Sequence, residues 1–151
     1  MLGGCVSLTA HPAQQVPKPI DMLLPVEVRI HPFTGTRTFD EAGGVKGIEV
    51  RVEAVNGFGD STAAFGEFAF ELYAFKSGDP DPKGDLIYNW QQSLLDAKQN
   101  RVHWDPITRT YVFRLQWHKA IPVGQRFVLT ASFSSPFTER LYAEHVFVSG
   151  Q

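Results

Sequence analysis

The sequence predicts an all-β protein folded as a two-sheet antiparallel β-sandwich of about seven strands. Segments in which apolar and polar residues alternate recur along the chain, and Pro, Gly and Asn separate them. Aromatic residues make up 13% of the sequence, including 12 Phe, and such side chains suit a half-buried pleated surface. The 151 residues are enough for one domain with its own core.

The clearest alternation lies between residues 45 and 75. Its first half alternates three aliphatic residues with charged ones, and its second half places Phe68, Phe70 and Leu72 on one face. Period-two alternation separates a buried face from an exposed one. A Gly- and Asn-containing turn at residues 56–60 lies between the halves. We therefore expect two neighbouring antiparallel strands at residues 45–55 and 66–76.

The other elements follow from the same pattern. We expect further strands at residues 24–31, 85–91, 108–118, 125–134 and 139–148. Residues 33–44 are expected to be a loop, and residues 91–99 are compatible with a short helical turn that Asn100 ends. Residues 100–106 are expected to be a loop or a short strand. The last strand carries apolar residues on both faces, so we expect it to be covered on both sides or to lie centrally.

Charge and cysteine content narrow the classes of function. The net charge is -2 and the isoelectric point is near 6.2, so the chain lacks the basic surplus typical of nucleic-acid binding. Its one cysteine, Cys5, has no second thiol for an internal disulfide or a cysteine-based zinc cluster. No apolar run approaches the roughly 20 residues that span a bilayer.

The N-terminus contains Leu2-Gly3-Gly4-Cys5, which resembles a bacterial lipobox. In lipoproteins with this motif the cysteine is lipidated and becomes the first residue of the mature protein. Four residues precede Cys5, fewer than the basic and apolar regions of a signal peptide require, so we interpret the chain as trimmed or its start as placed late. The alternative is an incidental cysteine in an ordinary terminus.

Residues 6–20 contain three prolines and no apolar periodicity, which is typical of an extended linker. We therefore expect a flexible N-terminal tether at residues 1–22 and the sandwich at residues 23–151. Together with the lipobox, this arrangement places the protein in a bacterial envelope, at the outer membrane or in the periplasm. It would contact the membrane through a lipid anchor only.

Two segments resemble the transthyretin-like or carboxypeptidase-regulatory-like sandwich family. They are Gly47-Ile48-Glu49-Val50-Arg51-Val52 and Gly66-Glu67-Phe68-Ala69-Phe70, within about a third of the chain. The family's usual Asp-Gly before the second strand is Phe65-Gly66 here. The resemblance implies a transthyretin-like or immunoglobulin-like sandwich that acts as an accessory or adhesive module rather than a catalyst.

Catalytic signatures are absent from the sequence. It contains no G-x-S-x-G, no phosphate-binding glycine loop and no H-E-x-x-H motif. His31, His118 and His145 fall in or near expected strands and would make a zinc or copper site if they met, but lone histidines on a strand face are more often surface residues. Acidic pairs are expected by chance among 16 acids. We therefore expect no enzyme activity and no cofactor.

Two candidate binding sites remain. Trp104, beside His103 in a polar loop, and Trp90 are candidates for stacking on sugar rings, although tryptophan also fills sandwich cores. Asp79, Asp81 and Asp85 lie close enough in sequence to share Ca²⁺, although two intervening prolines equally indicate a rigid polar turn. The expected function is a structural or interaction domain whose partners are envelope proteins or surface glycans. The alternative is a binding module for carbohydrate or calcium.

Overall fold

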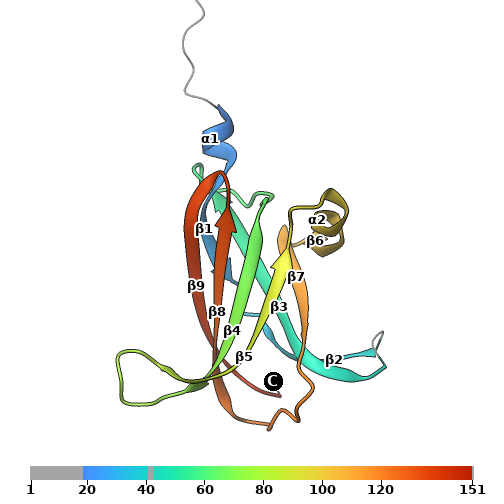
Figure 1. The fold of residues 1–151 in the computed structure, drawn as a ribbon, viewed down its shortest axis with the longest axis vertical. Coiled ribbons are helices and arrows are strands. Elements are labelled where there is room, and N and C mark those ends of the chain that lie inside the picture. Colours follow the sequence, from blue (N-terminus) through green and yellow to red (C-terminus); the bar gives the residue numbers. More distant parts are fainter. Residues whose placement is uncertain (1–18, 41–42, 151) are drawn as a thin grey trace, which may run out of the picture.

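The computed structural model describes residues 19–40 and 43–150, and it confirms a two-sheet antiparallel β-sandwich (Figure 1). The first sheet has the order β1-β3-β7-β6, with β2 also paired to β3. Its strands are β1 (Pro25–Ile30), β2 (Gly35–Phe39), β3 (Val45–Asn56), β6 (Trp104–Asp105) and β7 (Thr110–Gln116). The second sheet has the order β5-β4-β8-β9. Its strands are β4 (Glu67–Phe75), β5 (Lys83–Ser93), β8 (Arg126–Ser135) and β9 (Thr138–Val148).

The described residues form nine strands rather than about seven. The two additional strands are short and could not be recognised from the alternation of apolar and polar residues. The first, β2, lies in the expected loop and pairs along Val45–Glu49 of β3. Its Thr-Arg-Thr centre carries no apolar alternation, and Phe39 is its buried anchor. The second, β6, has two residues that pair with the start of β7.

The core forms where the predicted inward faces of both sheets meet. Aromatic rings dominate it: the Phe68 ring centroid lies 4.8 Å from that of Phe133 and 5.4 Å from that of Phe113. Such offset and tilted contacts are the favourable arrangements of aromatic pairs. Fully buried members include Ile48, Val50, Val52, Phe68, Phe70, Leu72, Phe113, Leu115, Leu129, Ala131 and Phe133. Each large apolar side chain contributes about 1.5–3 kcal/mol by leaving water.

The expectation that β3 and β4 pair with each other is wrong. β3 pairs with β1, β2 and β7 in one sheet, whereas β4 pairs with β5 and β8 in the other. The connection at residues 57–66 is long enough to carry the chain from one sheet to the other. Alternation identifies the buried face of a strand, but it does not show which other strand pairs with it.

The last strand also differs from its expected place. β9 is the edge strand of the second sheet, and Tyr142 and Val146 on its outer face are exposed. On this side of the sandwich β9 lies beside β1 of the other sheet. The apolar residues on its outer face are therefore exposed at a sheet edge and do not indicate a central position.

Two helices lie outside the sheets. Helix α1 (Pro19–Leu23) includes the last residues of the predicted tether and leads into β1. Helix α2 (Ala97–His103) follows β5, and the Asp96 side chain caps it by accepting hydrogen bonds from Lys98 N and Gln99 N at 3.0 Å. Both helices lie at the same end of the sandwich (Figure 1).

Candidate functional site

The predicted sugar-stacking residue Trp104 is not exposed in the expected way. It lies in β6, is half-buried, and packs edge-on against Tyr111 with 5.0 Å between ring centroids. Trp104 is therefore partly covered, and it lies in a short strand, which is one of the two structures expected for residues 100–106. The short pairing of β6 with β7 fixes this orientation by holding Trp104 opposite Tyr111.

His103 and Trp90 are also engaged in the fold. His103 Nδ1 lies 3.0 Å from the carbonyl oxygen of Val112, and its ring lies 4.7 Å from the Phe113 ring. The indole N–H of Trp90 donates to the carbonyl oxygen of Gln116 at 2.8 Å, which links β5 to β7 across the two sheets. The Trp90 ring lies 4.9 Å from that of Tyr88, and Tyr88 is the exposed member of this pair.

The three aspartates proposed for calcium take part in the β4–β5 hairpin. Asp79 pairs with Lys76 at 3.1 Å and accepts a hydrogen bond from Asp81 N. These contacts, the backbone one first, lower the pKa of Asp79. Asp81 accepts from Lys83 N, and Asp85 lies within β5. Within residues 19–40 and 43–150, no group of three or more His, Cys, Asp or Glu is placed to hold a metal ion, the Asp79, Asp81 and Asp85 set included.

Cys5, the predicted lipid-attachment residue, lies outside the described residues. The described chain begins at Pro19, at the end of the sandwich that carries α1 (Figure 1).

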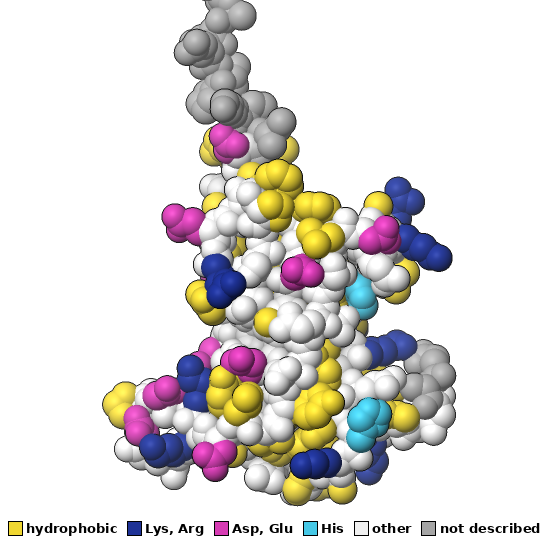
Figure 2. Space-filling model, viewed as in Figure 1, with side chains coloured by type: hydrophobic (Ala, Val, Ile, Leu, Met, Phe, Trp, Pro, Cys, Tyr) yellow, Lys and Arg dark blue, Asp and Glu magenta, His cyan; other side chains and the backbone are white. Residues whose placement is uncertain are grey.

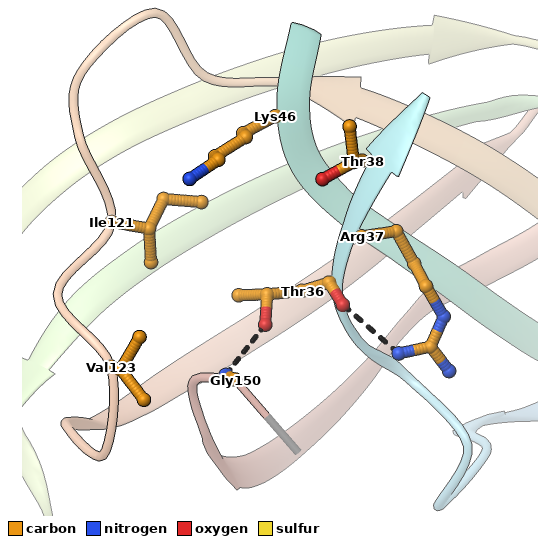
Figure 3. A pocket seen from close by; sticks show the side chains of 7 residues that line it. All are labelled: Thr36, Arg37, Thr38, Lys46, Ile121, Val123 and Gly150. Carbon is orange, nitrogen blue, oxygen red and sulfur yellow. Dashed lines mark hydrogen bonds between the residues drawn. The ribbon is translucent and has the colours of Figure 1, made fainter. Parts of the chain in front are cut away.

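A cavity of about 380 Å³ lies at the opposite end, between β2 and the loop before β8 (Figure 3). The Lys46 ammonium points toward Ile121 across this cavity, whereas the Arg37 side chain points away from it (Figure 3). Arg37 donates to the carbonyl oxygen of Thr36, and Thr36 Oγ1 accepts from Gly150 N at 2.8 Å. The cavity thus presents one ammonium group beside hydroxyl and apolar side chains.

A surface that sequence analysis missed lies at the α1 end of the sandwich. We call it the apolar end, and it consists of Met22, Leu23, Val26, Phe58, Phe65, Leu95 and Phe137. Figure 2 shows hydrophobic side chains gathered at this end. Phe137 is 64% exposed, Phe58 59% and Val26 56%, so these side chains are well outside the core. Contiguous exposed apolar surface of this kind marks interaction sites.

One ring contact, two shared cavities and a backbone hydrogen bond bring members of the apolar end together. The Phe65 and Phe137 rings lie 5.7 Å apart, and Phe65 and Leu95 line one shallow cavity. Phe137 and Val26 line a second cavity of about 310 Å³, together with Leu24, Pro25 and Leu141. Gly57 N donates a hydrogen bond to Met22 O at 3.0 Å, and this bond holds the turn that contains Phe58 next to α1.

Local sequence explains why these residues project outward. Val26 continues the apolar alternation of β1, but a register shift between Pro25 and Glu27 turns it to the surface. Phe58, Phe65 and Phe137 each lie beside a turn-forming residue, in Gly57-Phe58-Gly59, Phe65-Gly66 and Pro136-Phe137. A phenylalanine next to glycine or proline, at three positions in two loops, was the available signal.

Among the described residues no helix is long and apolar enough to cross a membrane. Searches of family models, of curated proteins and of solved structures found no match to this chain. The transthyretin-like resemblance therefore stays a prediction, while the sandwich architecture itself is shown.

Proposed function

We propose that this protein is a non-catalytic interaction domain of a bacterial envelope, held to the membrane by lipid on Cys5. The observation that carries the proposal is the Leu2-Gly3-Gly4-Cys5 motif, separated by a proline-containing segment from a stable sandwich. A lipidated cysteine followed by a spacer and a folded domain is a simple way to hold a domain at a membrane surface.

The use of the polar side chains supports a role in binding rather than catalysis. His103 and Trp90 contact backbone carbonyls, and Asp79 and Asp96 stabilise a turn and a helix start. These groups contribute to the fold instead of converging on a common point. Partners are then sought among envelope proteins and surface glycans.

Metabolic labelling tests the lipid anchor. The full-length gene product is expressed with a fatty-acid analogue, beside a Cys5→Ala variant. We expect the wild type to carry the label and the Cys5→Ala variant to carry none. Label on both proteins, or on neither, contradicts lipidation at Cys5. Equal melting temperatures of the two unlabelled proteins confirm that the substitution leaves the fold unchanged.

Carbohydrate binding is the second candidate, and the Tyr88–Trp90 ring pair favours it. Tyr88 is exposed beside the half-buried Trp90, so a sugar ring stacked on Tyr88 would change the environment of Trp90. Titration with glycans should then shift tryptophan emission in the wild type but not in Tyr88→Ala. Trp104→Ala tests the other predicted stacking residue, and this variant should keep the shift if the sugar binds at Tyr88. A parallel Ca²⁺ titration of the melting temperature tests Asp79, Asp81 and Asp85.

A further inference from the structure

We propose that the apolar end lies directly against the lipid bilayer, so that the domain is oriented on the membrane as well as anchored to it. This inference rests on the lipid anchor proposed above. It assigns a function to the seven residues of the apolar end and leaves the opposite end, with Lys46, facing away from the membrane.

The chain enters the domain at the apolar end. Helix α1 is fixed to the apolar end, because Gly57 N donates to Met22 O at 3.0 Å and Thr62 Oγ1 donates to Leu23 O at 3.1 Å. The anchored N-terminal segment therefore joins the domain at this surface and at no other.

The segment between Cys5 and the domain limits how far the apolar end can lie from the bilayer. Thirteen residues separate Cys5 from Pro19. Thirteen residues span at most about 45 Å when fully extended. The 12 residues of β3 extend about 40 Å from one end of the sandwich to the other. A lipid on Cys5 thus confines the apolar end to within that span of the bilayer, whereas the opposite end can lie about 40 Å farther away.

The side chains of the apolar end have the chemistry of a surface that inserts into a bilayer. Phenylalanine and aliphatic side chains that project from loops insert favourably into the interfacial region of a bilayer. Charges of both signs surround them: Asp21 and Glu139 line the cavity beside Phe137, and Lys98 and Arg101 belong to α2 beside Leu95. Because these charges offset one another, we expect the contact to depend on apolar insertion and to change little with salt concentration.

A quenching experiment tests the orientation with the full chain. Cys5 is the only cysteine, so a maleimide-headgroup lipid couples the protein to phosphatidylcholine vesicles at that residue alone. Phe137→Trp places a fluorophore at the apolar end, and Val123→Trp places one at the cavity of the opposite end. Vesicles made with brominated acyl chains quench tryptophans that enter the bilayer, and wild-type protein corrects for the three native tryptophans.

We expect strong quenching of the introduced tryptophan in Phe137→Trp, and the same quenching at high salt. The introduced tryptophan in Val123→Trp should not be quenched. Equal quenching in both variants, or none in either, overturns the proposal and would direct attention to a protein partner for the apolar end. A Phe58→Ser change added to Phe137→Trp should weaken the quenching, and its failure to do so also overturns the proposal. Because maleimide coupling supplies the anchor, this outcome is independent of the metabolic labelling that tests lipidation in cells.

Discussion

The hydroxyl of Tyr111 in β7 donates a hydrogen bond to Asn100 Oδ1 in α2, with 2.8 Å between the oxygens. The same hydroxyl accepts from Ala64 N at 2.9 Å, and Asn100 Nδ2 donates to the carbonyl oxygens of Ala64 and Leu94. Four segments are thus joined around one buried side chain: β7, α2, the β3–β4 connection and the end of β5. The network fixes the backbone next to Phe65 and Leu95, and it thereby shapes the apolar end.

Removing the Tyr111 hydroxyl should destabilise the protein. Tyr111→Phe leaves Ala64 N without its buried acceptor and Asn100 Oδ1 without its donor, so we expect the free energy of unfolding to fall by about 1–3 kcal/mol. Urea denaturation measures the change. Tyr142→Phe is the matched control, because Tyr142 is exposed on β9, and it should change stability by less than about 0.5 kcal/mol. Equal effects of the two changes would contradict the network.

Gly47 is required by close packing between strands. A Cβ atom at this position in β3 would overlap the carbonyl oxygen of Leu115 and lie 2.6 Å from Cε2 of Phe39. Gly47→Ala should therefore lower the free energy of unfolding by about 1–3 kcal/mol. In the control Gly57→Ala, the nearest atom is Met22 O at 3.4 Å, an ordinary contact. Chemical denaturation of both variants should show a loss of stability in Gly47→Ala only.

The exposed Phe58 should contribute to surface binding and little to stability. Phe58→Ser is expected to change the free energy of unfolding by less than about 0.5 kcal/mol, because the side chain lies largely in water. The same change should shorten retention on a hydrophobic-interaction column. A large loss of stability would show instead that Phe58 belongs to the core.

His145 should make stability depend on pH. Burial, followed by the charge of His31, lowers the pKa of His145 below its ordinary 6.5. The unfolded chain therefore takes up a proton more readily than the folded one. This contribution to stability is complete above pH 6.5 and is lost as the pH falls toward the lower folded-state pKa. When the pH falls from 7.5 to 5, the unfolding free energy of the wild type should therefore decrease more than that of His145→Gln. A difference between the two proteins that stays constant over this range would contradict the lowered pKa.

Most of the long strands were predictable because they have a strict inward face. Ile48, Phe70 and Phe113 could be assigned to the core from alternation alone, since a shift of one residue would expose an entire apolar row. The pairing of strands was not predictable in this way: β3 and β4 are consecutive yet belong to different sheets. That choice depends on the path of the connection at residues 57–66, which no periodicity describes.

The candidate sites were harder to predict than the fold. Trp104 looked exposed because its neighbours in sequence are polar, but pairing with β7 turns it toward Tyr111. The apolar end was missed because its members come from five separate loops and segments and meet only in the folded chain. Alternation with the buried Val28 and Ile30 would place Val26 in the core, but the register shift in β1 turns it to the surface.

Membrane fractionation of cells that express the full-length gene product tests the central claim most directly. We predict wild-type protein in the membrane fraction, retained after a high-salt wash because a covalent lipid and apolar contacts hold it, and Cys5→Ala in the soluble envelope fraction. A wild type and a Cys5→Ala variant that distribute identically between the two fractions would contradict it.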